Sequence, residues 1–337
     1  MCIRDSSSAA EKVWNYSKKG SDAVYRDKKI ALAIPAHNEE RLITPTLESV
    51  PDYVDRIFVV DDGSSDRTCD VVKELAKGDA RIELIEHGTN RGVGQAIITG
   101  YRQASEENCD VTVVAGGDHQ MPLEAINQLV DPVIDGEADY TKGNRFLMPD
   151  TGLDDMPWTR FFGNALISLM TKIASGFYKI YDVVDGFTAI SKRAIDLVDW
   201  DSAWKGYGYP MDFLVRLNAY GMRVRDVPRR AIYLEGERQS QIKGLRYALR
   251  VSPMMIRGFF WRLHMKYLVR DFHPLYFFYL FGLIFLPLGV LFGGFLVHQQ
   301  WVGAGVSGPK SVVCALMIMM GLQFMLFAIL YDMQESE

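Results

Sequence analysis

The sequence has few cysteines and none in a paired spacing. Its four cysteines are scattered over 337 residues, at Cys2, Cys69, Cys109 and Cys314. This scatter disfavours a disulfide framework or a zinc site and favours reduced thiols. The stretch Met1–Gly20 also lacks an apolar core. We therefore expect no secretory signal there, and we expect residues 1–27 to form a mobile N-terminal arm.

Charge is missing from two long stretches near the C-terminus. Neither Pro274–Val297 nor Ser311–Tyr331 contains Asp, Glu, Lys or Arg, although 23% of the whole chain is charged. A bilayer core of about 30 Å needs about 20 apolar residues in a helix. We therefore expect two transmembrane helices, at about 274–297 and 311–331, in a membrane domain of residues 273–337. A hairpin buried in a large soluble core is the alternative, but soluble helices rarely lack a polar face over such lengths.

Acidic residues are absent between Lys243 and Arg270, although the chain has a formal net charge of −5. Seven basic residues alternate there with apolar ones: Lys243, Arg246, Arg250, Arg257, Arg262, Lys266 and Arg270. The pattern predicts a basic amphipathic segment at residues 243–272 that lies on anionic membrane lipids, where each nearby cation contributes about 1 kcal/mol. By the positive-inside rule the large N-terminal part is then cytosolic. An integral membrane protein of a prokaryotic plasma membrane or an endoplasmic-reticulum-like membrane is expected.

Short apolar runs alternate with helix-length segments from Lys29 onward. The runs are Ile30–Ile34, Arg56–Val60, Ile82–Glu86 and Val111–Ala115, and the segments between them are Glu39–Val50, Asp66–Lys77 and Val93–Glu107. This alternation predicts an α/β fold with a parallel sheet covered on both faces. Ligands of such sheets bind outside the carboxyl ends of the strands. Functional residues are therefore expected directly after each run.

Polar residues follow all four runs, at 35–40, 61–66, 90–94 and 116–120. No Gly-x-Gly-x-x-Gly follows the first run, which disfavours a dinucleotide fold of the dehydrogenase type. Carboxylates at two strand ends suit a different ligand. They fit a nucleotide whose diphosphate is held through a metal ion and whose ribose or base is held by carboxylates.

Seven motifs, taken in order, resemble those of glycosyltransferase family two. They are Ile34–Glu40, Val59–Asp66, Asn90–Gly94, Gly117–Gln120, Gly143–Arg145, Asp182–Ser191 and Tyr209–Asp212. The similarity is to the non-processive branch, and within it to the polyprenyl-phosphate (dolichyl-phosphate) sugar transferases. It covers about Lys29–Ile242 and extends to the two terminal spans. It implies a GT-A type nucleotide-sugar-binding domain over residues 28–242, with a mostly parallel central sheet.

The resemblance also implies where a nucleoside diphosphate sugar lies. The residues expected to border it are Pro35, Asn38, Glu39, Asp62, Arg91, Gly92 and Gly117. For Asp62 the alternative is a structural role in a turn that leads into a helix. Asp66, which precedes a helical pattern, is expected to be the helix cap rather than a ligand.

Asp118 matches the second carboxylate of the family's Asp-x-Asp metal motif, whose first position is Gly116 here. Magnesium commonly keeps several waters and takes one or two carboxylates plus substrate phosphates. Asp118, helped by Gln120, is therefore expected to hold Mg²⁺ or Mn²⁺ together with the diphosphate, with His119 as a neighbour. Because of Gly116, a catalytically inactive, membrane-anchored relative stays an alternative.

The implied reaction is the attack of a polyprenyl phosphate on the anomeric carbon of the sugar, which expels UDP or GDP. A phosphate monoester has a second pKa near 6, so this nucleophile barely needs a general base. Bringing two anions together instead calls for a metal ion and arginine. Arg145 and Arg160 are the candidates for the acceptor phosphate, although Arg160 also fits a solvated charge that begins a helix. Asp212 is expected to orient the acceptor or a sugar hydroxyl.

Asp118, Asp212 and Arg145 are thus the expected catalytic residues, and the donor stays open between GDP-mannose and a UDP-hexose. A processive polysaccharide synthase is the alternative enzyme. It would add a Gln-x-x-Arg-Trp element and more membrane spans, whereas this chain has Gln239-Ser240-Gln241-Ile242-Lys243 and two spans. No nucleic-acid partner is expected, and association into a homo-oligomer is left open.

Overall fold

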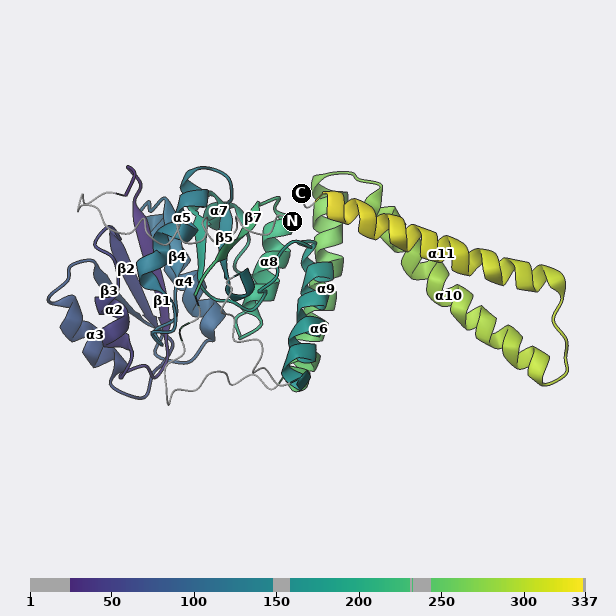
Figure 1. The fold of residues 1–337 in the computed structure, drawn as a ribbon, viewed down its shortest axis with the longest axis horizontal. Helices are drawn as coiled ribbons and strands as arrows, with labels where there is room; N and C mark the ends of the chain where they lie inside the picture. Colours follow the sequence, from purple (N-terminus) through teal and green to yellow (C-terminus); the bar gives the residue numbers. More distant parts are fainter. Residues whose placement is uncertain (1–24, 148–157, 231, 233–243, 336–337) are drawn as a thin grey trace, which may run out of the picture.

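The structure is a computed structural model that describes residues 25–147, 158–230, 232 and 244–335. An α/β part comes first, and an apolar helical hairpin extends away from it (Figure 1). Helices α6 and α9 lie between the sheet and the hairpin. Most of the predicted N-terminal arm, up to residue 24, lies outside the described residues. At its end, the Tyr25 hydroxyl donates a hydrogen bond of 2.7 Å to Asp131.

Seven strands form one sheet in the order β3-β2-β1-β4-β6-β5-β7. They are β1 Ile30–Ala36, β2 Arg56–Asp61, β3 Ile82–Glu86, β4 Val111–Val114, β5 Tyr140–Asn144, β6 Thr188–Ser191 and β7 Val224–Pro228. Only β6 runs against its neighbours, β4 and β5, among these described strands. The mostly parallel sheet expected from the sequence is confirmed, and its four predicted runs are β1 to β4.

Among the described residues, ten α-helices and three short helical turns surround the sheet or follow it. In the α/β part they are α2 Ile43–Glu48, α3 Thr68–Ala76, α4 Val93–Glu106, η1 Leu123–Ala125, α5 Ile126–Ile134, η2 Arg145–Leu147, α7 Lys192–Leu197 and α8 Tyr209–Ala219. Beside and beyond it lie α6 Trp158–Ser175, α9 Gly244–His264, the π-helical turn η4 Met265–Arg270, α10 Leu275–Trp301 and α11 Gly308–Gln334. The predicted helix 66–77 is thus α3, which begins two residues later than expected.

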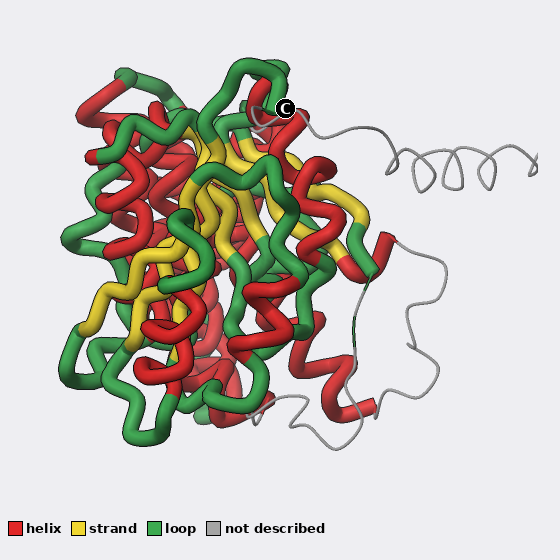
Figure 2. The backbone as a smooth tube through the Cα atoms, turned by 90° about the vertical axis from the view of Figure 1, so that its left-hand side faces the viewer, coloured by secondary structure: helices red, strands yellow, loops and turns green. Residues whose placement is uncertain are grey.

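Helices of the α/β part cover both faces of the sheet (Figure 2). Side chains of a strand point alternately to its two faces, and β1 divides accordingly. Ile30, Leu32 and Ile34 belong to a core with residues of α2, α3 and α5, whereas Ala33 belongs to a core with residues of α4, α6, α8 and α9. Burial on both faces explains why β1 is a continuous apolar run.

The hairpin consists of α10 and α11, each long and apolar enough to cross a membrane. Only 17% of the most apolar stretch of each helix is buried, unlike a hairpin in the core of a soluble protein. The two helices approach closely at Gly321, where an added Cβ would lie 2.4 Å from the backbone nitrogen of Leu286. Small residues at such contacts are typical of helix pairs in membranes.

Three of the seven basic residues counted between 243 and 270 contact protein groups, and of these Arg270 is also exposed to solvent. Arg262 is fully buried, Lys266 donates to the Asn218 side chain at 3.1 Å, and Arg270 donates to the Ala219 carbonyl at 3.3 Å. Arg250 and Arg257 on α9 are exposed. The predicted contact with anionic lipids therefore stays a prediction for Arg250, Arg257 and Arg270, and it does not describe Arg262.

Candidate active site

Asp62 joins the second and third sequence motifs. It follows β2, and its carboxylate accepts hydrogen bonds from the backbone N–H groups of Arg91 and Gly92, both at 2.8 Å. The His87 ring lies 2.9 Å from the same carboxylate. Asp62 is buried, so in this structure it fixes the loop after β3. Its predicted contact with a base or ribose stays a prediction, and so does that of the exposed Arg91.

Gly92 and Gly94 bring a distant loop against the start of α4. Gly92 has φ +97°, and a Cβ there would lie 2.4 Å from the carbonyl oxygen of Lys205. The N–H of Gly94 donates to that same carbonyl at 2.7 Å. Glycine is required because a left-handed φ and a close backbone contact coincide at residue 92. The motif Asn90–Gly94 thus seats the loop that precedes α8.

The first motif packs against the second and the fourth. Asn38, at φ +59°, accepts the Ser65 N–H at 2.8 Å through its side-chain oxygen. The N–H of Glu39 donates to Thr68 Oγ1 at 2.8 Å. A Cβ on Gly117 would lie 3.5 Å from Cγ of Glu39. The edge formed by Pro35, Asn38, Glu39 and Gly117 is therefore continuous, as the parallel strands predict.

Asp118 lies at the same edge, just after β4. Its Oδ1 accepts a hydrogen bond of 3.3 Å from the N–H of Gln120. Burial raises the pKa of Asp118 above its ordinary value, and the Gln120 N–H and the charge of Arg229 oppose that shift. A Cβ on Gly116 would lie 3.0 Å from Oδ1 of Asp118. The carboxylate thus occupies space that a larger residue at 116 would need.

The residues at this edge fit a metal ion that is shared with a substrate. The described residues contain no group of three or more His, Cys, Asp or Glu side chains able to hold a metal alone. A hard divalent cation, however, needs only one or two protein carboxylates when substrate phosphates and waters complete its shell. Asp118 supplies one such carboxylate. The roles predicted for Asp118 and Gln120 as ligands stay predictions.

Arg145 lies at the end of β5 and is held by two buried carboxylates. Its Nε and Nη2 donate to Asp182 at 2.7 and 2.9 Å, and its Nε lies 3.3 Å from Asp185. Burial would raise the pKa of Asp182, but the hydrogen bonds and charge of Arg145 outweigh it and lower that pKa. The Arg145 side chain keeps 30% of its surface exposed. It is therefore both positioned and accessible to a ligand.

The sequence pattern did not point to Arg229, which follows β7. Because β5 and β7 are parallel and pair Asn144 with Pro228, Arg145 and Arg229 come at adjacent strand ends. Arg229 donates from Nε to Asp185 at 2.6 Å, and its charge acts on Asp118. Recognising β7 as a parallel strand would have placed Arg229 at the edge, but that short strand lacks a clear apolar run.

A buried lysine completes this charged group. Lys142 of β5 is 1% exposed and donates to the Asp185 carbonyl at 2.7 Å. Burial lowers its pKa, although Asp185 and Asp182 oppose that shift. The Lys142 contact fixes the turn between Asp182 and Asp185, which carries the partners of Arg145. This turn corresponds to the sixth motif of the sequence.

Asp212 lies in the first turn of α8. Its Oδ2 accepts hydrogen bonds of 2.8 Å from the Trp204 N–H and from Nε of Arg216. It lines a cavity of about 520 Å³, together with Trp204, Arg216 and residues of α9, and Asp118 is not among the lining residues. Asp212 therefore holds the loop that packs on Gly92. Its predicted role toward the acceptor stays a prediction.

Arg160 lies in the first turns of α6, and its side chain lies outside the described part of the chain. The predicted contact of Arg160 with the acceptor phosphate therefore has no structural description. The other predicted site residues, except Asp212, lie along the carboxyl edge of the sheet.

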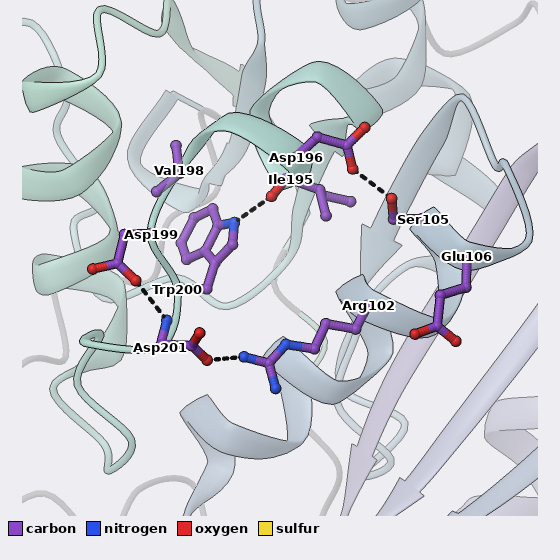
Figure 3. A pocket seen from close by; sticks show the side chains of 9 residues that line it. All are labelled: Arg102, Ser105, Glu106, Ile195, Asp196, Val198, Asp199, Trp200 and Asp201. Carbon is purple, nitrogen blue, oxygen red and sulfur yellow. Dashed lines mark hydrogen bonds and ion pairs between the residues drawn. The ribbon is translucent and has the colours of Figure 1, made fainter.

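A hollow of about 310 Å³ between α4 and α7 lies elsewhere (Figure 3). It contains none of the predicted site residues. Ser105, which lines it, comes 13 residues after Gly92 along α4, or about 20 Å at 1.5 Å per residue. Two of its acidic side chains already have partners, since Asp196 accepts a hydrogen bond from Ser105 and Asp201 from Arg102. This hollow is not the site to which the motifs point.

Residues 31–198 match the family described as glycosyl transferase family 2. A UDP-N-acetylglucosamine–dolichyl-phosphate N-acetylglucosaminyltransferase of Methanococcus voltae is 31% identical to this chain over 222 residues, which are 62% of this chain and 88% of that relative. The chain belongs to glycosyl transferase family 2. This family 2 glycosyltransferase is also 31% identical to an undecaprenyl-phosphate mannosyltransferase of Micrococcus luteus over 205 residues, 59% of this chain and 82% of that protein.

A solved structure supports the fold. Glucosyl-3-phosphoglycerate synthase from Mycobacterium tuberculosis, in complex with UDP, superposes with a TM-score of 0.50 at 17% identity, over 73% of this chain and 86% of that one. The same synthase, in complex with Mn²⁺, UDP-glucose and phosphoglyceric acid, also gives a TM-score of 0.50, at 18% identity over 73% and 85% of the two chains. The GT-A type fold expected from the sequence is confirmed.

Proposed function

We propose that this family 2 glycosyltransferase transfers one sugar from a nucleoside diphosphate sugar to a polyprenyl phosphate at the cytosolic face of a membrane. The donor is GDP-mannose or a UDP-hexose, including an N-acetylhexosamine. The observation that carries the proposal is the combination, in one chain, of Asp118, Arg145 and Arg229 at one sheet edge with an exposed apolar hairpin. The relatives named for dolichyl and undecaprenyl phosphate support the lipid acceptor.

The donor side of the proposal rests on the sheet edge. Asp118 brings a carboxylate there, and Arg145 and Arg229 bring two guanidinium groups fixed by Asp182 and Asp185. Guanidinium groups bind phosphate oxygens with directional, charge-assisted hydrogen bonds. Because both arginines are already oriented, little further ordering is needed when the diphosphate binds. When bound, Mg²⁺ or Mn²⁺ would be held by Asp118 and would neutralise charge on the departing diphosphate.

The acceptor side needs no strong base. A phosphate oxygen of the lipid forms a bond to the anomeric carbon while the bond from that carbon to the diphosphate oxygen breaks, and the nucleoside diphosphate leaves with the electron pair. A single displacement of this kind inverts the anomeric configuration. The phosphate monoester is already ionised near neutral pH, so no proton has to be removed. We assign the binding of the incoming phosphate to Arg145, and the 30% exposure of its side chain supports this role.

The membrane part of the proposal rests on the hairpin. Helices α10 and α11 contain 27 residues each, or about 40 Å at 1.5 Å per residue, enough to cross a bilayer core of about 30 Å. A short apolar hairpin that enters and leaves on the same side keeps the α/β part next to one leaflet. A lipid-borne phosphate is presented at that surface.

The test is transfer of labelled sugar into a lipid fraction. Purified protein in bilayers that contain polyprenyl phosphate is given labelled GDP-mannose, UDP-glucose or UDP-N-acetylglucosamine, with Mg²⁺, Mn²⁺ or chelator. We expect one donor to yield a lipid-linked monosaccharide, and chelator to abolish the yield. Chiral analysis of the product is expected to show inversion at the anomeric carbon.

Other products would contradict the proposal. A growing polymer would indicate a processive synthase. No labelled lipid from any donor, combined with no metal-dependent binding of UDP or GDP by folded protein, would indicate an inactive relative.

A further inference from the structure

An ion pair is buried where the hairpin meets the α/β part. Nη1 and Nη2 of Arg262, on α9, donate to Oδ1 and Oδ2 of Asp332, on α11, both at 2.8 Å. The two side chains are 0% and 1% exposed. Asp332 is the one acidic residue of α11, and it lies in the last turn of that helix. A charge buried at this point needs a complete set of partners.

Three tyrosines provide further hydrogen-bond partners for the Asp332 carboxylate. The hydroxyl of Tyr267 donates to Oδ1 of Asp332 at 2.7 Å, and those of Tyr178 and Tyr279 donate to Oδ2 at 3.1 and 3.2 Å. These residues come from the loop after α6, from η4 and from α10. We call Tyr178, Arg262, Tyr267, Tyr279 and Asp332 the junction cluster. Through this cluster the loop after α6, α9, η4 and α10 all donate hydrogen bonds to one carboxylate of α11.

The end of α6 and the residue that follows it contact Arg262. Nη2 of Arg262 also donates to the carbonyl of Ile173 at 3.2 Å. Gly176 has φ +75°, and a Cβ there would lie 2.2 Å from Nη1 of Arg262. Only glycine combines this left-handed backbone with the close contact. The local chain thus leaves room for the guanidinium of Arg262.

The same short segment leads directly to the candidate active site. Tyr178 binds Asp332, and four residues later Asp182 binds Arg145. Between them, the N–H of Tyr181 donates to Asp226 at 2.9 Å. Residues 176–182 therefore connect the end of the hairpin to the carboxylate that orients Arg145. Hydrogen bonds at Tyr178, Tyr181 and Asp182 fix this path of seven residues to its surroundings.

Stability alone does not explain a buried ion pair. Apolar residues of similar volume often stabilise a protein as well or better, because they avoid the cost of removing charges from water. A bidentate Arg–Asp pair instead imposes a defined direction and distance. The junction cluster therefore suits a role in orienting the hairpin.

We propose that the junction cluster positions the active site relative to the bilayer, so that Arg145 stands at the level of a membrane-borne acceptor phosphate. Arg262 and Asp332 are positioning residues that touch no substrate. The inference rests on the proposed function. It predicts that breaking the cluster impairs use of an acceptor anchored in the membrane, while an acceptor that diffuses freely to the site is used as before.

The experiment compares two acceptors in the parent protein and in Asp332→Asn, which keeps the shape of the side chain. One acceptor is a long-chain polyprenyl phosphate in bilayers, and the other is a short-chain, water-soluble prenyl phosphate. We expect kcat/KM to fall about tenfold or more for the membrane-borne acceptor, in line with the cost of a misplacement of about 1 Å. For the soluble acceptor and for nucleoside diphosphate binding, we expect a change of less than about threefold.

Two further variants keep the test decisive. Glu335→Gln changes an exposed carboxylate three residues later on the chain and should leave both acceptors unaffected. The double variant Arg262→Met/Asp332→Leu removes both charges without leaving either one unpaired, which favours a stable fold. It should show the same selective loss as Asp332→Asn.

Equal losses with both acceptors, or unchanged use of the membrane-borne acceptor in both cluster variants, would overturn the inference. Failure of the proposed function has a different signature. In that case the parent protein itself would transfer sugar to neither acceptor.

Discussion

Two arginine–aspartate pairs in this molecule have similar geometry and different surroundings. Arg145 and Arg262 each form two hydrogen bonds to one carboxylate, Asp182 and Asp332 respectively, at 2.7 to 2.9 Å. The Arg145 side chain is 30% exposed, whereas the Arg262 side chain is fully buried. The first pair lies at the carboxyl edge of the sheet, and the second lies at the base of the hairpin.

The exposed fraction of the arginine side chain decides whether its guanidinium group can bind a ligand. At the sheet edge, Arg145 is oriented by protein but still open to an anionic ligand. In the junction cluster, the carboxylate of Asp332 has five donors and the pair has no surface left for a ligand. The same chemical pair therefore suits binding in one place and orientation in the other. Variants of the two regions should separate these roles.

The largest effect on stability is expected from Arg262→Met. The change leaves the Asp332 carboxylate buried without its cation, and loss of one partner of a buried pair costs about 3–5 kcal/mol. Thermal unfolding in detergent should shift strongly downward. Arg257→Met, on an exposed position of the same helix, should change stability by no more than about 0.5 kcal/mol. Similar shifts of the unfolding temperature for both variants would show that the buried ion pair of Arg262 adds no more to stability than an exposed arginine does.

At the sheet edge, Asp118→Asn should have the largest effect on transfer. Loss of the carboxylate removes the charge expected to hold the metal ion, and a single group of this kind is worth about 10²- to 10³-fold in rate. Steady-state transfer kinetics would measure it, with circular dichroism to verify folding. The exposed Glu124→Gln serves as the matched control. Activity retained within a few-fold would remove Asp118 from the mechanism.

The two arginines should respond differently to lysine. Arg145→Lys keeps the charge but loses the planar fork, and loss of a charge-assisted hydrogen bond costs about 1.5–3 kcal/mol, or about 10- to 100-fold in kcat/KM. Its thermal stability should change little because the side chain is partly exposed. Arg262→Lys should show the reverse, with a lowered unfolding temperature. Matching behaviour of the two variants in both assays would contradict the assigned difference.

Gly92→Ala should disturb the sheet-edge site through the backbone. The residue has φ +97° and faces the Lys205 carbonyl, so the methyl group meets both strain and a clash, together about 1–3 kcal/mol. Gly88→Ala is the matched control, since Gly88 also has a positive φ (+71°) but no atom within 4 Å of its Cβ position. Chemical denaturation should show a larger loss for Gly92→Ala. Equal losses would mean that the contact with Lys205 is unimportant.

The smallest effect is expected from Tyr279→Phe in the junction cluster. One of five hydrogen bonds to Asp332 is lost while the ring remains, which corresponds to about 0.5–1.5 kcal/mol. We expect a modest shift in the unfolding temperature. A shift as large as that of Arg262→Met would show that the tyrosine hydrogen bonds, rather than the ion pair, supply most of the cluster's stability.

Much of the fold was predictable because β1 to β4 are buried on both faces and therefore appear as apolar runs. The polar residues after these runs meet at one edge as expected. By contrast, β5 contains the buried Lys142 and β7 contains Arg225 and Asp226, so neither strand gives an apolar run. Arg229 was missed for this reason.

The inward hydrogen bonds of Asp62 and Asp212 were not predictable from motif positions, because their donors are contributed by other loops. The junction cluster was hidden for a related reason. Arg262 and Asp332 are 70 residues apart in the sequence, and a count of basic residues treats Arg262 like its exposed neighbours. Only the packing of α6, α9 and α11 brings the pair together.

The most direct test of the contrast between the two regions is calorimetric titration of UDP and GDP in the presence of Mn²⁺ or Mg²⁺. The parent protein, Asp118→Asn and Asp332→Asn are compared, each also with chelator. We predict metal-dependent binding of one nucleoside diphosphate by the parent and by Asp332→Asn, and its loss in Asp118→Asn. Undiminished metal-dependent binding by Asp118→Asn, or its loss in Asp332→Asn alone, would contradict the account.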